Sequence, residues 1–171
     1  MKLHRLFLIL TLMVFSTNGF AQNGNEMKAK MAVEDAETAY QSQDYQKAIT
    51  LLESAEKLLG RATARTRYSL ILALNKNLTQ DYEYKDLEKL RNLTRHYLDN
   101  YTTDIEKYRD IYDLSNNIDK DYPKNLEEFN QFVQEQKTRI VEKEIHQKKL
   151  QAVIDFGNEW SNKYYFKTIF E

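Results

Sequence analysis

The chain is poor in the residues that make crosslinks and turns: its 171 residues include no cysteine, one proline and four glycines. The absence of cysteine excludes disulfides, and it also excludes lipid attachment at an exported cysteine. With so few turn-forming residues and with 30% of its residues charged, the composition favours a few long helices and leaves little room for β-structure.

The amino terminus has the pattern of a secretory signal peptide. A basic start is followed by an apolar run of about ten residues from Leu6 to Phe15, and Gly19 and Ala21 are small residues at the positions that a signal peptidase reads. We expect cleavage between Ala21 and Gln22. The alternative is an uncleaved membrane anchor, but a spanning helix needs about 20 apolar residues and this run is about half as long.

Cleavage would leave about 150 residues, which is the length of one domain. The leader carries Lys2 and Arg5 and no acidic residue, so its loss would change the formal net charge from −1 to about −3. Such a charge gives no general attraction to nucleic acid or anionic lipid, and we expect neither a nucleic-acid partner nor stable membrane insertion. Export without disulfides indicates a bacterial envelope protein, periplasmic or secreted, because small secreted eukaryotic domains usually need disulfides.

Apolar residues spaced three and four apart predict a series of amphipathic helices. The expected helices cover about 26–41, 45–59, 63–77 and 87–101, then 104–121 and a long segment from 124 onward. Asp44 is expected to cap the second helix, and Gly60 is expected to end it. Thr103 and Glu106 are expected to form a capping box that opens the fifth helix. The buried face of that helix is expected to carry Ile105, Tyr108, Ile111, Tyr112, Ser115 and Ile118.

The expected organisation is a signal peptide at 1–21, a helical-repeat domain at 22–122, a long C-terminal helix at 123–156 and an aromatic tail at 157–171. Polar residues interrupt the apolar seam of the long helix, which therefore predicts a protruding helix rather than a regular coiled coil. Two interpretations of the tail stay open. The aromatic residues can fold back over the last helix or the open end of the array, or they can form a docking segment for a partner.

The first hairpin resembles a known repeat. The stretch Tyr45-x-x-Ala48-x-x-x-Leu52-x-x-Ala55 is similar to the second helix of a tetratricopeptide repeat, and small residues lie in the preceding helix where that family packs its first helix. The chain departs from the family pattern at Ala32, Gln43 and Gly60, where a large residue, a turn glycine and a closing proline are usual. A second, degenerate repeat extends the resemblance to about Tyr101.

This resemblance implies an all-α fold in which antiparallel helical hairpins stack as a short tetratricopeptide-like array, followed by the long C-terminal helix. It also implies that the first helices of the hairpins line a groove for a protein or peptide partner. The residues expected on that groove are Glu37, Tyr40, Gln41, Arg67, Ile71 and Asn75. For each of them an ordinary solvated or core position is the alternative, and for Ile71 the core position is favoured.

Residues that would support catalysis are scarce. Only His96 and His146 follow the leader, and neither belongs to a catalytic or metal-binding pattern. No glycine-rich phosphate loop and no nucleophile elbow occur. We therefore expect a non-catalytic interaction module without a cofactor or metal. Two alternatives remain: a structural protein that self-associates through its C-terminal helix, and a small-ligand binder that uses the helices rich in tyrosine, a residue that occurs twelve times.

Overall fold

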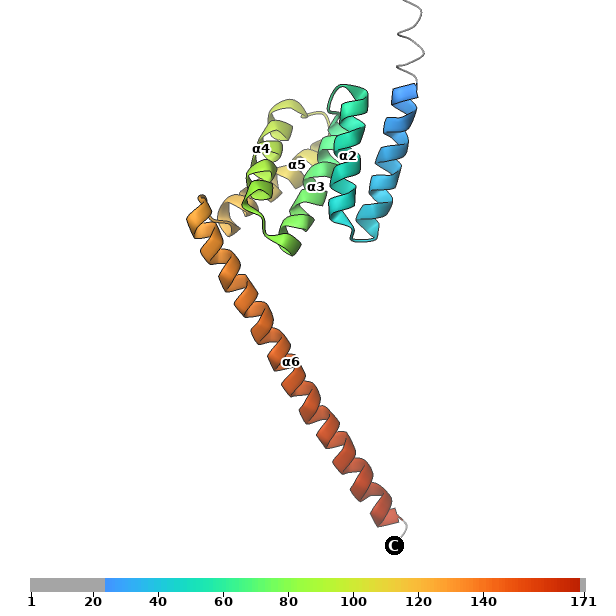
Figure 1. Ribbon diagram of the computed structural model, residues 1–171, viewed down its shortest axis with the longest axis vertical. Helices are drawn as coiled ribbons and strands as arrows, with labels where there is room; N and C mark the ends of the chain where they lie inside the picture. Colours follow the sequence, from blue (N-terminus) through green and yellow to red (C-terminus); the bar gives the residue numbers. More distant parts are fainter. Residues whose placement is uncertain (1–23, 170–171) are drawn as a thin grey trace, which may run out of the picture. The chain divides into compact units, whose positions relative to one another are not determined.

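The computed structural model describes residues 24–169, without the side chains of 162 and 164–169, and the described residues form six helices and no strand (Figure 1). The signal peptide and its cleavage site lie outside the described residues. The helices are 24–41, α2 (Tyr45–Leu59), α3 (Ala64–Asp81), α4 (Tyr84–Asn100), α5 (Ile105–Asp121) and α6 (Leu126–Ile169). The predicted all-α class with a long last helix is confirmed. The chain divides into two units, one ending at Asp121 and one beginning at Tyr122.

Local chemistry sets the ends of α2, as the sequence predicts. An Asp44 carboxylate oxygen accepts a hydrogen bond from the backbone N–H of Lys47 at 3.2 Å, which satisfies one of the amides that a helix start leaves free. At the other end Gly60 has φ 66°, a left-handed conformation that glycine adopts without strain. The Thr63 backbone N–H and the Thr66 backbone N–H then each donate to the other residue's hydroxyl, at 3.0 and 3.1 Å, and open α3.

The end of α3 and the cap of α5 differ from the prediction. The third helix continues to Asp81, one turn beyond the expected end, and stops where Tyr82 takes a left-handed conformation. The cap of α5 is Asp104 rather than Thr103. An Asp104 carboxylate oxygen accepts from the backbone N–H of Lys107 at 3.2 Å, and its second oxygen accepts from the Lys107 Nζ at 2.6 Å. The expected capping box of Thr103 and Glu106 is wrong, because Lys107 donates two hydrogen bonds to Asp104, one from its backbone N–H and one from its side chain.

The buried face of α5 is narrower than its apolar pattern suggests. Ile111 and Ile118 are buried, but Ile105 is 74% exposed and Tyr112 is 52% exposed. The prediction that these two residues belong to the buried face is wrong. They lie at one edge of the predicted stripe, about 100–140° around the helix from Ile111 and Ile118 at its other edge, and the buried face is centred on that other edge.

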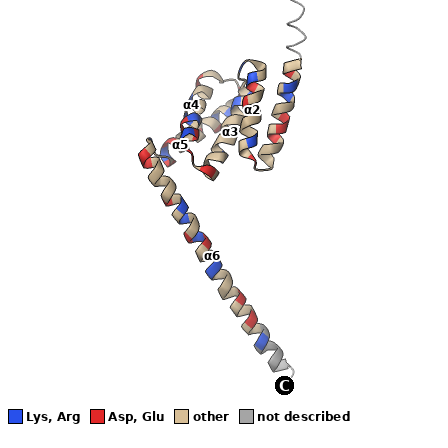
Figure 2. Ribbon diagram, viewed as in Figure 1, with Lys and Arg blue, Asp and Glu red and all other residues tan. Residues whose placement is uncertain are grey.

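The last helix is longer than predicted. It runs without interruption from Leu126 through Gly157 to Ile169, so the helix does not end at Gly157 and the segment after it does not fold back on α6 itself. A single glycine costs a helix only about 1 kcal/mol. Among the side chains of α6 that the structure describes, only Phe129 and Val133, near its start, are buried. Beyond them the described side chains are almost all exposed, and charged residues of both signs are interspersed along the helix (Figure 2).

Alanines form much of the core at the amino-terminal end of the first unit. Five of them are between 0% and 5% exposed, namely Ala29, Ala36 and Ala39 of helix 24–41 and Ala48 and Ala55 of α2. Helix 24–41 and α2 run side by side in opposite directions (Figure 1). Because the distance between packed helices depends on the side chains at the contact, alanines allow these helices to approach closely. The core then continues through α3, which carries the longest series of buried residues.

Hydrogen bonds and ion pairs between helices that are two apart along the chain define a two-layer array. Arg65 donates to Glu37 at 2.6 Å, Tyr68 donates to Asp110 at 2.8 Å, and Lys89 pairs with Glu53. These interactions join helix 24–41 to α3, α3 to α5, and α2 to α4. In addition, α2 packs against α3, α3 against α4 and α4 against α5. Helix 24–41, α3 and α5 therefore form one layer, and α2 and α4 form the other, as in a stack of antiparallel hairpins.

Candidate functional site

A groove lies between helix 24–41 and α3, with α2 at its floor. Its lining residues are Ala36, Glu37, Tyr40, Gln41, Ala48, Leu52, Ser69 and Leu72. Its volume is about 170 Å³, similar to an engineered apolar cavity of about 150 Å³ that holds benzene. The groove is therefore large enough for one leucine or phenylalanine side chain.

The floor of the groove is apolar. Ala36, Ala48 and Leu52 are buried and provide only hydrocarbon, and the half-buried side chain of Leu72 forms part of the wall. None of these four side chains carries a hydrogen-bonding group. A polar group inserted here would lose its water without gaining a partner, which costs free energy. The floor therefore favours an apolar group.

The rim of the groove is polar. Glu37 accepts from Arg65 at 2.6 Å, and both side chains are largely exposed. The Tyr40 ring packs edge-on against Tyr45 with ring centroids 5.3 Å apart. Burial raises the pKa of Tyr40, and the nearby Tyr45 raises it further, so its hydroxyl is neutral and available to donate at physiological pH. Gln41 and Ser69 add an amide and a hydroxyl, giving several groups that can bond to a peptide backbone.

Three of the six predicted groove residues come together here: Glu37, Tyr40 and Gln41 line the groove. The other three, all in α3, lie elsewhere. Ile71 is 0% exposed and belongs to the core, which is the alternative that the sequence favoured for it, and it does not line the groove. Asn75 is half-buried and is not among the residues that line the groove.

Arg67 faces α2 instead of the groove. Its Nε lies 3.2 Å from a carboxylate oxygen of Glu56, and that oxygen also accepts from the Thr66 hydroxyl at 2.9 Å. Both members of the ion pair are largely shielded from solvent. A shielded carboxylate requires a cation and hydrogen-bond donors, and Glu56 therefore holds Arg67 against α2. The expectation that Arg67 faces the groove is wrong for this reason.

The sequence analysis missed Ser69 and Leu72, which line the groove, and Arg65, which pairs with Glu37 at its rim. They lie on α3 one or two residues from the expected positions. The run from Leu70 to Leu74 is apolar on every side of the helix, so periodicity does not specify which residues face the groove.

A cluster of tyrosines joins the later helices of the array. The Tyr68 hydroxyl donates to Asp110 at 2.8 Å, and burial together with this bond raises the pKa of Tyr68 to about 12. The buried Tyr97 ring lies 6.3 Å from the Tyr68 ring and 5.1 Å from the Tyr101 ring. Lys107 lies over the Tyr68 ring, 5.8 Å from its centroid. These contacts link α3, α4 and α5 and extend the array beyond the first hairpin.

Within residues 24–169, no group of three histidine, aspartate or glutamate side chains is placed to hold a metal ion. None of the helices in this part of the chain combines the length and apolar character that crossing a membrane requires. The chain matches no protein-family model, no curated protein and no solved structure.

Proposed function

We propose that the chain is an exported, non-catalytic interaction module of the bacterial cell envelope, and that its array, of tetratricopeptide type, binds an extended segment of another protein. The groove between helix 24–41 and α3 carries this proposal. It lies between neighbouring members of one layer, where the resemblance to the repeat family implies that a partner binds. It also combines an apolar floor with a polar rim, which suits a peptide that presents one apolar side chain.

The floor and the rim have separate roles in this proposal. An apolar side chain of the partner fills the space above Ala48 and Leu52, and its burial contributes about 1.5–3 kcal/mol. Such a contribution is too small for tight binding by itself. The partner's backbone bonds to Tyr40, Gln41 and Ser69, which fixes the direction of the segment and adds affinity.

A substitution that fills the groove tests this proposal. A library of displayed random peptides is selected on the chain from Gln22 to Glu171, and the recovered peptides are titrated by fluorescence anisotropy. Ser69→Phe places a ring in the groove and should weaken binding of those peptides about tenfold or more. Thr50→Phe is the matched control, because Thr50 is exposed on α2 and does not line the groove.

Circular dichroism verifies that both variants fold. We expect the recovered peptides to share an apolar residue and the control to bind them as the unsubstituted chain does. A library that yields no binder, or peptides that bind Ser69→Phe at full affinity, would refute the groove as a docking site. Equal loss in the Thr50→Phe control would assign binding to another surface.

The proposed export has its own test. When the full chain is produced in a bacterial host and recovered from the periplasm or medium, mass spectrometry should find an amino terminus at Gln22. An intact chain that still begins at Met1 and stays with the membrane fraction would support the uncleaved anchor instead.

A further inference from the structure

Positive charge gathers along α3, the helix that forms one wall of the groove. Residues 60–80 contain four cationic residues and no aspartate or glutamate, although the whole chain has a formal net charge of −1. The four are Arg61, Arg65, Arg67 and Lys76. Helix 24–41 compensates one of them, since Glu37 pairs with Arg65, and α2 compensates another, since Glu56 pairs with Arg67. The other two form no ion pair with a described residue, so this wall keeps positive charge that the array does not neutralise.

Lys76 lies on the side of α3 that faces the groove. It follows Leu72 by four positions and Ser69 by seven, and α3 is continuous from Ala64 to Asp81. At about 100° per residue, Ser69, Leu72 and Lys76 lie within about 60° of arc. Lys76 is therefore about 6 Å farther along the helix than Leu72, next to one end of the groove. Its side chain is exposed and forms no hydrogen bond with a described residue.

The two ends of the groove differ in charge. At one end Arg65 donates to Glu37 across the groove at 2.6 Å, so the cation and the carboxylate compensate each other. Glu37 is the only carboxylate among the residues that line the groove, and it is therefore already paired. At the other end Lys76 lies one helical turn beyond Leu72 without a compensating carboxylate. A segment that occupies the groove meets one neutral end and one positive end.

Given the docking function proposed for the groove, on which this inference rests, we propose that the bound segment carries an aspartate or glutamate that pairs with Lys76. In an extended segment, alternate side chains point to the same side and are about 6.6 Å apart, which matches the distance of about 6 Å from Leu72 to Lys76 along α3. The acidic residue therefore lies two positions from the apolar residue that fills the groove. The pairing also fixes the direction of the segment, because the reverse direction would bring the acidic residue toward Glu37.

Charge reversal at Lys76 tests the pairing. Displayed peptides selected on the chain from Gln22 to Glu171 should be enriched in aspartate or glutamate two positions from their apolar residue. Lys76→Glu should weaken their binding about threefold or more in fluorescence anisotropy, because a repulsion replaces an attraction. A peptide in which lysine replaces the acidic residue should bind Lys76→Glu more tightly than it binds the unsubstituted chain. These differences should shrink as the salt concentration rises.

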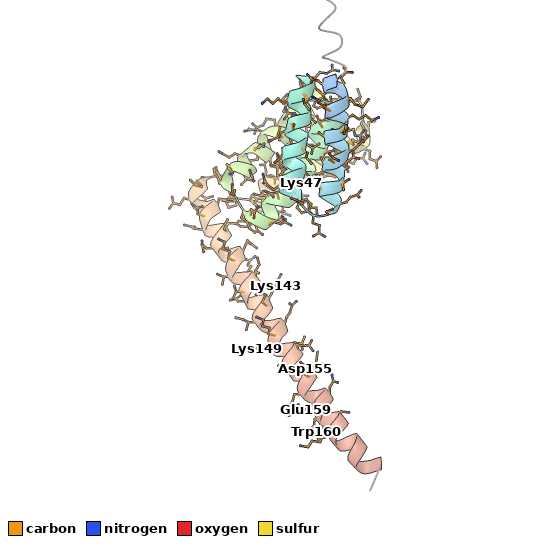
Figure 3. The ribbon with its side chains drawn as sticks, turned by 45° about the vertical axis from the view of Figure 1, so that its right-hand side comes forward. Lys47, Lys143, Lys149, Asp155, Glu159 and Trp160 are labelled. Atoms are coloured by element: carbon orange, nitrogen blue, oxygen red, sulfur yellow. The ribbon has the colours of Figure 1, made fainter. Side chains whose placement is uncertain are left out.

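Lys47→Glu is the matched control. It changes the net charge by the same amount, and Lys47 is an exposed residue of α2 that does not line the groove (Figure 3). We expect this variant to bind the selected peptides as the unsubstituted chain does, and circular dichroism verifies that both variants fold. Equal weakening by Lys47→Glu would show an effect of net charge alone and would overturn the pairing with Lys76.

The pairing and the docking site can fail separately. Selected peptides that share an apolar residue but have no preference for an acidic one would overturn the pairing and leave the groove as a docking site. Unchanged binding of acidic peptides to Lys76→Glu would do the same. A library that yields no binder would overturn the docking site and the pairing together.

Discussion

Replacing Ala55 by leucine tests whether the helices of the array approach as closely as the alanines allow. Ala55 lies in α2, its side chain is 0% exposed, and α2 packs against α3. A larger side chain at a fully enclosed position forces neighbouring side chains out of their rotamers or moves the backbone. Such overpacking typically costs about 1–3 kcal/mol of unfolding free energy.

The size of this effect is within reach of ordinary unfolding experiments. For a domain of this length, a loss of 1 kcal/mol lowers Tm by about 2–4 °C, so Ala55→Leu should lower Tm by about 2–12 °C. Urea unfolding followed by circular dichroism gives the free energy directly. Ser54→Leu is the matched control. Ser54 is the preceding residue and is exposed, so the same new side chain should change stability by no more than about 0.5 kcal/mol.

Two outcomes would refute the reasoning. If Ala55→Leu unfolds at the same urea concentration as the unsubstituted chain, there is room beside Ala55 for a larger side chain, and α2 and its neighbours do not pack as closely as alanine contacts allow. If Ser54→Leu is equally destabilising, the loss arises from leucine within α2 and not from the contact between helices. A stable Ser54→Leu beside a weakened Ala55→Leu would support close helix packing.

Two further predictions concern hydrogen bonds in the array. Tyr68→Phe removes the bond to Asp110 and should lower the free energy of unfolding by about 1 kcal/mol. Because folding favours the neutral hydroxyl, this contribution is present below about pH 10 and is lost as the pH rises through the Tyr68 pKa of about 12. A spectrophotometric titration of the variant should lack the one tyrosine that ionises near pH 12. Bonds from the Lys107 side chain and its backbone N–H lower the pKa of Asp104 below its usual 3.8, so the contribution of Asp104 is present above that pH and lost as the pH falls through its folded pKa. The difference in urea midpoint between the Asp104→Asn variant and the unsubstituted chain should therefore stay constant above about pH 4 and shrink as the pH falls below the usual 3.8, and a difference that persists unchanged at lower pH would contradict the assignment.

The parts of the fold that the sequence predicts correctly are those that depend on neighbours in the chain. Asp44 caps α2 through a residue three positions away, and Gly60 ends it through its own backbone conformation. The buried alanines also follow from spacing alone, since together with Val33 and Leu52 they recur every three or four positions within each helix. Each of these features needs no information about distant parts of the chain.

The errors occur where local signals are ambiguous. Thr103 and Asp104 are adjacent and both can cap a helix, and the two hydrogen bonds from Lys107 decide between them. Gly157 is a weak breaker, and α6 continues through it. In α5 the apolar stripe is wider than the face that its neighbours cover, which leaves Ile105 exposed. Tertiary contacts decide each case, and the pattern of residue types alone does not include them.

The orientation of α3 about its own axis links the core of the array to the proposed groove. Glu56 holds Arg67 against α2, and Ile71 fills the core on the same side of α3. Ser69 lies two positions from Arg67 and Leu72 lies one position from Ile71, so both are turned toward helix 24–41 and line the groove. A single rotation therefore determines both the buried contacts of α3 and the residues that line the groove. For this reason the amino-acid sequence predicted the existence of a groove more reliably than it predicted the α3 residues that line it.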